Sequence, residues 1–137
     1  MDKNERYTLG KNERLKSRKA IDQLFKEGKS LSLFPLRIIY QKMIQPQHTT
    51  VFNLQAGFTV STKHFKKAAD RNRIRRLIRE AYRLQKNELQ QTLSKGEIKL
   101  DIFFIYTGKE VPDYAIIFEK IKIAIDKLQQ LVIAKNR

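Results

Sequence analysis

Hydrophobic and polar positions recur along the chain with two different periods, and the changes of period divide it into elements. Helical spacing within residues 17–27 predicts a short helix, with Ser17 as its N-cap and Gly28 as its stop. Residues 36–42 and 51–61 are rich in β-branched and aromatic side chains, which favours strands. The second of these is one strand or two with a break near Asn53, and a turn is predicted at residues 45–48.

Helical periodicity returns at Ser61 or Thr62 and continues to about Leu93, and Lys95-Gly96 is predicted to end the helix. Residues 100–106 then read as a strand that is apolar on both sides. A last helix is expected to start after Pro112, with Asp113 as its N-cap. The apolar residues expected to face the core from this helix are Ile117, Ile121, Ala124, Leu128 and Leu131. The order helix, two or three strands, long helix, strand, helix predicts an α+β fold with one sheet of about four strands and helices packed on it.

The length of 137 residues fits one domain, which we place at residues 15–135. Residues 1–14 are polar and charged, and we expect them to be mobile until a partner binds. No apolar run reaches the ~18 residues of a membrane helix, and the polar start of the chain does not resemble a secretory signal. The chain has no cysteine and only two distant histidines, which excludes disulfide frameworks and zinc fingers. We therefore expect a cytoplasmic protein.

The basic charge of the chain is large and concentrated. The 29 Lys and Arg residues outnumber 14 acidic residues, for a net charge of +15, which favours a polyanionic partner. Residues 63–86 hold ten of these cations and two acids. On a helical wheel the apolar side of this segment consists of Ile74, Leu77, Ile78, Ala81 and Leu84. The polar side, within roughly 100° of arc, consists of Asn72, Arg75, Arg76, Arg79, Arg83 and Lys86.

The spacing and type of these cations indicate what they bind. Like charges four residues apart, such as Arg75 and Arg79, destabilise a helix, so a merely solvated face would more often alternate in sign. The arginine fork holds phosphate with two hydrogen bonds. The pattern predicts a nucleic-acid-binding helix, although charge alone does not separate RNA from DNA. An anionic membrane is a weaker alternative because the apolar side lacks the Trp or Phe of membrane-lying helices.

A second candidate surface precedes this helix. Alternation along residues 55–63 directs Ala56, Phe58 and Val60 to the core and Gly57, Thr59, Ser61 and Lys63 to the other side. That small, polar side with a cation at its rim suits a sugar–phosphate strand, and an ordinary solvated sheet face explains it equally well. Phe25, Phe34 and Tyr40 are candidates for stacking on unpaired bases, although core packing is commoner for such residues.

No catalytic motif is recognisable in the sequence. There is no Ser/His/Asp or Cys/His set, no HExxH, no phosphate-binding glycine loop and no carboxylate cluster. Asp101 lies in an apolar strand, where pairing with a nearby Lys or Arg is the more ordinary expectation than a functional role.

The run Arg71-Asn72-Arg73-Ile74-Arg75-Arg76-Leu77-Ile78-Arg79-Glu80-Ala81 resembles the signature helix of one family, the protein subunit of bacterial ribonuclease P. Val60-Ser61 with Lys63, and Arg14-Leu15-Lys16 followed by Leu24-Phe25-Lys26-Glu27-Gly28, are similar to other segments of that family. The resemblance covers roughly residues 14–93. It implies an α+β fold with a left-handed βαβ crossover, which periodicity does not reveal.

The resemblance also implies function. In this family a large catalytic RNA, with bound Mg²⁺, hydrolyses the phosphodiester that releases the 5′ leader of precursor tRNA, and the protein is an accessory subunit of that endonuclease. The residues implied to contact the catalytic RNA are Arg71, Asn72, Arg73, Arg75, Arg76, Arg79 and, by continuation of the same face, Arg83. Asn72 is also implied to lie near a metal site. The residues implied to line a leader-binding cleft between sheet and first helix are Phe25, Tyr40, Thr59, Ser61 and Lys63. The implied partners are the catalytic RNA and precursor tRNA, without an obligate protein partner.

Three positions depart from the family pattern. Ile21 stands where an aromatic is usual, Thr62-Lys63 replaces a lysine pair, and residues 64–68 replace a Gly-Asn-Ala segment. A ribosomal or RNA-chaperone protein is the runner-up, separated by the signature helix alone. A DNA-binding protein ranks lower because strand, and not a helix-turn-helix, precedes the basic helix.

Overall fold

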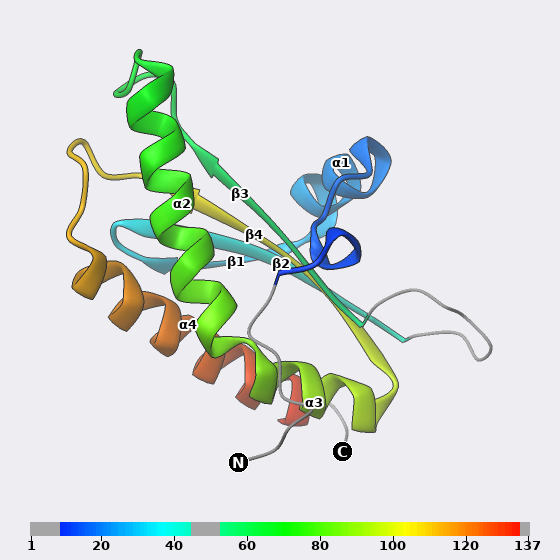
Figure 1. The fold of residues 1–137 in the computed structure, drawn as a ribbon. Helices are drawn as coiled ribbons and strands as arrows, with labels where there is room; N and C mark the ends of the chain where they lie inside the picture. Colours follow the sequence, from blue (N-terminus) through cyan, green and yellow to red (C-terminus); the bar gives the residue numbers. More distant parts are fainter. Residues whose placement is uncertain (1–8, 45–52, 135–137) are drawn as a thin grey trace.

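The computed structural model describes residues 9–44 and 53–134, and its strands form one mixed sheet (Figure 1). The strands are β1 (Lys29–Leu33), β2 (Leu36–Ile44), β3 (Leu54–Val60) and β4 (Ile98–Tyr106), in the spatial order β1-β2-β4-β3. β2 pairs antiparallel with β1 and β4, whereas β3 pairs parallel with β4. The helices are α1 (Arg18–Glu27), α2 (Ala68–Gln85), α3 (Asn87–Gly96) and α4 (Tyr114–Ala134), with a 3-10 turn η1 at Lys11–Glu13. The predicted α+β architecture is confirmed.

The helices lie on both sides of the sheet. α2, α3 and α4 lie on one side, and α1 lies on the other (Figure 1). Along β4, Leu100, Ile102 and Phe104 pack in the main core under the larger helix layer. The alternate residues Phe103 and Ile105 pack instead with Leu24 of α1 in a smaller cluster. We call the side of the sheet that carries Phe103 and Ile105 the α1 face.

The first helix begins and ends as its sequence predicts. Ser17 Oγ accepts a hydrogen bond from the Ala20 N–H at 3.2 Å, which is an N-cap. The Gly28 N–H donates to Leu24 O at 2.8 Å. A Cβ on Gly28 would lie 2.4 Å from that carbonyl oxygen and 3.0 Å from Ile39, so glycine is needed where the chain leaves α1 close to β2. This junction holds α1 against the sheet.

The sheet has four strands, as predicted, but one of them, β1, was not among the predicted segments. β2, β3 and β4 occupy the predicted segments, and β1 is the third strand before the long helix. The alternation Lys29-Ser30-Leu31-Ser32-Leu33 was its overlooked signal. Asn53 precedes β3, and the predicted turn at 45–48 lies outside the described residues.

The long helix differs from its prediction at its start and in its continuity. It begins at Ala68, and not at Ser61 or Thr62, because Arg71 donates to the carbonyls of Phe65 (2.7 Å) and Lys66 (2.9 Å) and so holds the preceding loop in a non-helical path. The helical segment ends at Gly96, as predicted, but it is divided at Lys86 into α2 and α3. Glu97 then takes a left-handed conformation with φ 53°.

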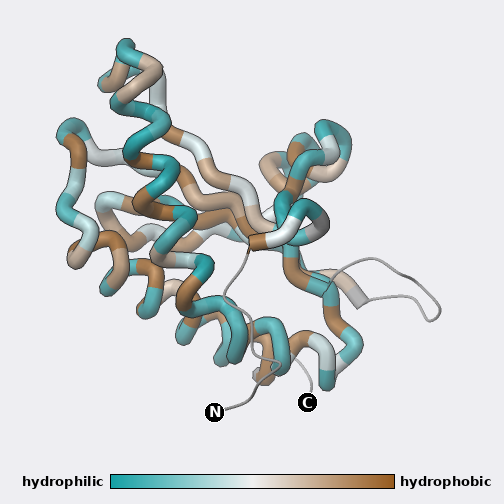
Figure 2. The backbone as a smooth tube through the Cα atoms, viewed as in Figure 1, coloured by the Kyte–Doolittle hydropathy of each residue, from teal (hydrophilic) through white to brown (hydrophobic). Residues whose placement is uncertain are grey.

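Most of the predicted core side of the helices is buried, but Leu77 is only partly buried, and Leu84 and Leu131 are exposed. Ile74, Ile78 and Ala81 are fully buried, and Figure 2 shows hydrophobic and hydrophilic positions alternating along α2. Leu84 is 38% exposed, and Tyr82 is buried in its place, against Phe58 and Phe104. On α4, Ile117, Ile121, Ala124 and Leu128 are buried as predicted. Leu131 is exposed instead of facing the core, because the buried side of that helix continues through Val132.

The N-terminal segment is part of the domain from residue 9 onward. Leu9 packs against the main core, and the Leu15 N–H donates to Ala56 O at 2.9 Å. Glu13 forms an ion pair of 2.7 Å with Lys86, whose side chain is 3% exposed. The domain therefore starts before residue 15, and Lys86 does not belong to the exposed basic face where the wheel placed it. Lys86 follows the buried Tyr82 by four residues, and the N-terminal segment supplies Glu13 as its partner.

β3 and β4 form a βαβ unit through α2 and α3, and the left hand of that crossover stays a prediction of the resemblance. Asp101 is buried and pairs with Lys99, as its sequence position suggested. Among the described helices, none is long and apolar enough to cross a bilayer.

Candidate RNA interface

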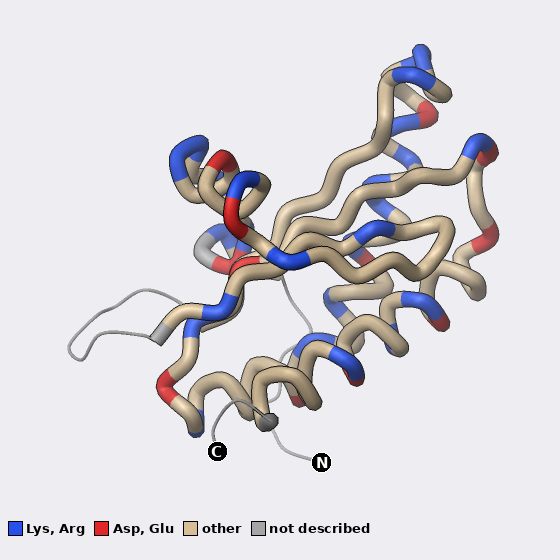
Figure 3. Tube along the Cα trace, turned by 180° about the vertical axis from the view of Figure 1, so that it is seen from behind, with Lys and Arg blue, Asp and Glu red and all other residues tan. Residues whose placement is uncertain are grey.

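The outer side of α2 presents arginines that the rest of the described chain does not neutralise. Arg73 and Arg76 are exposed, and Arg75 and Arg79 are partly exposed. Within the described residues no acidic side chain pairs with any of these four. Blue segments recur along α2 behind the sheet in Figure 3. Because like charges repel and no local acid compensates them, this side of α2 is suited to hold a polyanion.

Four of the predicted RNA-contacting residues, Arg75 among them, have partners within the protein. Arg71 donates hydrogen bonds to the two loop carbonyls, and Asn72 Oδ1 accepts a hydrogen bond from the Arg75 guanidinium. Arg83 donates through Nε to Glu80 at 3.1 Å. That hydrogen bond, reinforced by the charge of Arg83, holds the pKa of Glu80 below its usual value. Part of the donor capacity of Arg71 and Arg83 is therefore used within the protein.

The predicted second surface lies on the α1 face. Thr59 pairs in register with Ile105, so its side chain shares the side of the sheet on which α1 packs. Phe25 is 47% exposed, and its ring meets the Phe103 ring edge-on at 5.1 Å. Ser61 and the exposed Lys63 follow the end of β3, where Ser61 Oγ accepts from the Lys63 N–H at 3.2 Å. The structure thus places Phe25 and Thr59 on one side of the sheet, with Ser61 and Lys63 just beyond the end of β3.

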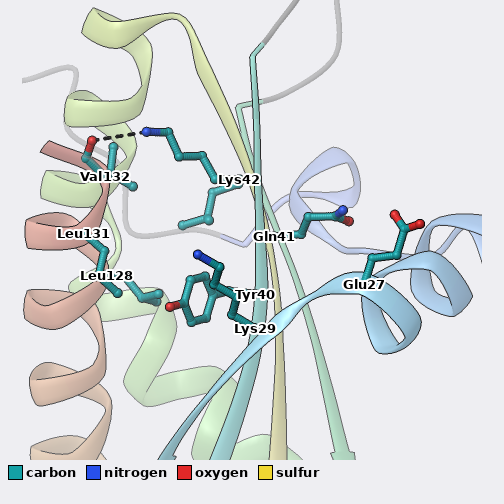
Figure 4. A pocket seen from close by; sticks show the side chains of 9 residues that line it. Glu27, Lys29, Tyr40, Gln41, Lys42, Leu128, Leu131 and Val132 are labelled. Atoms are coloured by element: carbon teal, nitrogen blue, oxygen red, sulfur yellow. Dashed lines mark hydrogen bonds between the residues drawn. The ribbon is translucent and has the colours of Figure 1, made fainter. Parts of the chain in front are cut away.

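Tyr40 does not belong to this surface, which corrects its predicted place beside α1. It pairs with Ile102, a residue of the main core, and so faces the opposite side of the sheet. There it lines a pocket of about 240 Å³ with Leu128 and Leu131 of α4, and Figure 4 shows Tyr40 and Gln41 on opposite sides of β2. The alternation of side chains along a strand is the reason, and it places Ile39 on the α1 face instead.

Phe34, the remaining aromatic candidate, lies at the turn between β1 and β2. Phe34 is 71% exposed at the β1–β2 turn, so core packing, the commoner expectation, was wrong for it. Ile21, at the departing position of α1, packs partly buried beside Leu24 and Ile39. Phe65 of the departing loop is buried against Tyr106, with ring centres 6.0 Å apart.

The residues around Asn72 do not fit a metal ion held by the protein. In the described part of the chain no three His, Cys, Asp or Glu side chains come together as such a site requires. The amide oxygen of Asn72 already faces a guanidinium, which repels a second cation. We therefore derive no step from a metal held by these side chains.

Comparison with known proteins identifies the family. The family model Ribonuclease P matches residues 9–129. The ribonuclease P protein component of Porphyromonas gingivalis is 37% identical over 108 residues, which is 79% of this chain and 77% of that protein. The protein component of Chlorobium phaeobacteroides is 34% identical over 121 residues and covers 83% of each chain.

Solved structures support the fold. The RNase P protein from Thermotoga maritima superposes with a TM-score of 0.61 at 28% identity, over 84% of this chain and 96% of that one. The Staphylococcus aureus RNase P protein gives 0.64 at 19% identity, over 85% and 94%. The exposed arginines of α2 and the matches along nearly the whole domain lead to one conclusion: the chain belongs to the ribonuclease P protein family.

Proposed function

We propose that this chain is the protein subunit of a ribonuclease P and assists an RNA-based endonuclease in removing the 5′ leader of precursor tRNA. The observation that carries the proposal is the uncompensated arginine side of α2 in a chain of this family. Nothing in the described residues resembles a hydrolytic centre of side chains, so catalysis is assigned to the RNA and positioning to the protein.

The catalytic RNA is proposed to lie along the outer side of α2. Arg73, Arg75, Arg76 and Arg79 supply the main phosphate contacts because no acid in the described chain pairs with them. Arg71, Asn72 and Arg83 supply weaker contacts, since they bind loop carbonyls, the Arg75 guanidinium and Glu80. Arg75 gives a donor to the neutral Asn72, and no acid in the described chain compensates its charge. A cation at each exposed position adds affinity without reading base identity, which suits a partner recognised by shape.

The leader is proposed to lie on the α1 face. Phe25 offers a half-exposed ring for an unpaired base, and Thr59, Ser61 and Lys63 offer hydroxyls and a cation to the backbone. Tyr40 is left out of this surface because it faces α4. Mature tRNA lacks the leader, so these residues distinguish substrate from product.

Magnesium is proposed to be held by the RNA. The protein contributes positive charge near it, and no described group of side chains is available as a metal cage. We propose that the protein acts in the cytoplasm, in complex with its RNA, where new tRNA is processed.

The test is reconstitution of the holoenzyme. The full chain is added to a bacterial ribonuclease P RNA with precursor tRNA at low magnesium, and cleavage is compared with that of the RNA alone. We expect faster cleavage and tighter substrate binding with the protein present. If cleavage is not enhanced, the proposal fails, and a ribosomal or chaperone role would have to explain the basic helix.

For the leader surface, the variant Lys63→Ala is compared with Lys127→Ala, an exposed cation on α4 on the other side of the sheet. We expect Lys63→Ala to weaken binding of leader-bearing substrate more than binding of mature tRNA, whereas Lys127→Ala changes neither preferentially. Equal weakening of both ligands by Lys63→Ala would remove the leader from this surface.

A further inference from the structure

The ring of Phe103 has a place on the α1 face that depends on a glycine in the next strand. Phe103 of β4 pairs with Gly57 of β3, and a Cβ on Gly57 would lie 2.3 Å from the ring. No real Cβ tolerates that distance, so the ring lies directly over the glycine backbone. Because Gly57 has no side chain, the ring of Phe103 packs directly against the backbone of β3.

The same ring supports Phe25. The two ring centres lie 5.1 Å apart at an interplanar angle of 70°, the edge-to-face geometry that aromatic pairs prefer. Phe25 is 47% exposed, and Phe103 is partly exposed. One aromatic from α1 and one from β4 thus form a single apolar step on the α1 face, which also carries the partly buried Ile21 and Ile105.

An unpaired arginine lies beside this step. The strand registers place Ser32, Arg37, Ile105 and Thr59 in one row across all four strands, on the α1 face. Arg37 and Ser32 are exposed, and within the described residues Arg37 makes no ion pair or hydrogen bond. Asp101, the acid of β4 on this face, is already neutralised by Lys99.

We infer that Phe103 and Arg37 form, with Phe25, a nucleotide subsite for single-stranded RNA that crosses the sheet from β3 toward β1. A base contacts the Phe25–Phe103 pair, and an adjoining backbone phosphate binds the Arg37 guanidinium, with the Ser32 hydroxyl beside it. The inference rests on the proposed leader surface and extends it by two contacting residues and one positioning residue, Gly57.

The dimensions and chemistry of the row favour this ligand. Thr59 and Arg37 lie two strand spacings apart, about 10 Å, so the polar groups span more than one nucleotide step. Single-strand sites combine stacking surfaces with cations that follow the backbone, and they need no pattern of base-edge donors. An arginine also suits this place better than a lysine because its planar fork can hold one phosphate through two donors.

The base contact is tested with holoenzyme carrying Phe103→Leu, which keeps an apolar side chain over Gly57 and removes the aromatic face. Affinity is measured for precursor tRNA with an intact leader and for a series in which single leader bases are removed. We expect at least about fivefold weaker binding of the intact leader, the lower end of base–aromatic stacking. For the substrate that lacks the base contacting Phe103, the variant and the unmodified protein should bind equally well, because no base is left there to stack.

Gly57→Ala is the positioning variant, since it forces Phe103 aside while leaving the ring in the chain. It should mimic Phe103→Leu against the same abasic position, and thermal unfolding of the free protein shows whether it remains folded. If Gly57→Ala does not fold, Phe103→Leu alone decides. A loss that persists equally at every abasic position would mean a structural role only, and would overturn the base contact.

The phosphate contact is tested with Arg37→Ala and Arg37→Lys, with Lys127→Ala as the control for charge. Arg37→Ala should reduce the slope of log affinity against log salt by about 0.7 for leader-bearing substrate, the value for one phosphate of a single strand. The slope for mature tRNA should stay unchanged, and lysine should restore most of it. An equal change of slope for both ligands would overturn the assignment.

A wrong nucleotide subsite can be distinguished from a wrong leader surface. If Lys63→Ala and Phe25→Ala reduce leader preference while Phe103→Leu and Arg37→Ala do not, the further subsite is wrong and the leader surface stands. If none of the four changes leader preference, the leader surface itself is wrong.

Discussion

The ion pair between Glu13 and Lys86 is predicted to stabilise the fold and to take no part in RNA binding. Nζ and the carboxylate lie 2.7 Å apart, with side-chain exposures of 3% for Lys86 and 14% for Glu13. Removing one member of a buried pair leaves the other charge unpaired and costs about 3–5 kcal/mol. We expect Glu13→Ala to lower the free energy of unfolding by about 3 kcal/mol, the lower end of this range, because the slight exposure of the pair admits some water to the ammonium.

The effect is measured by urea or thermal unfolding of the free protein. For a domain of this size 3 kcal/mol corresponds to a fall in Tm of about 10 °C. The double variant Glu13→Leu with Lys86→Met removes both charges and should recover most of the loss, since apolar replacement of a buried pair is often neutral. A loss below about 1 kcal/mol for Glu13→Ala, or a double variant no better than the single one, would refute the reasoning.

The same pair separates a structural cation from a binding one. The double variant should leave the salt dependence of catalytic-RNA binding unchanged, because Lys86 does not reach the surface. Arg79→Ala should do the opposite, leaving stability nearly unchanged and reducing the salt slope. If the double variant reduced the slope as well, Lys86 would have to reach the RNA in the complex.

Three further predictions concern α2 and its neighbours. Arg75→Ala with Arg79→Ala should reduce the slope of log affinity for the catalytic RNA against log salt by up to about 1.8, two duplex phosphates; an unchanged slope in filter binding would mean that these arginines face elsewhere. Glu97→Gly should stabilise the protein by about 1 kcal/mol in urea unfolding, since Glu97 holds φ 53°, and a destabilised variant would contradict this. Tyr82→Phe should cost less than about 0.5 kcal/mol, because the buried Tyr82 hydroxyl has no hydrogen-bond partner among the described residues; a loss above 1 kcal/mol would show that the hydroxyl is bonded.

Local patterns in the sequence were sufficient for the class of the fold and for the basic helix. The cap at Ser17, the stop at Gly28 and the periodicity of α2 each depend on neighbours within a few residues, which is why they could be predicted. The concentration of arginines on one side of α2 is equally local, so the sequence alone predicted a nucleic-acid partner, and the family resemblance named it.

Contacts between segments that are distant in sequence determined which side chains are buried and which share a surface. Lys86 looked like one more exposed cation until the N-terminal segment brought Glu13 to it, and Tyr40 was placed beside α1 until its pairing with Ile102 turned it toward α4. Phe103, an apolar residue in an apolar strand, gave no sign of its partners. Its contacts with the Phe25 ring and with the Gly57 backbone join α1, β4 and β3, which are distant in sequence. Only the strand order, the register and the packing of α1 bring these residues together.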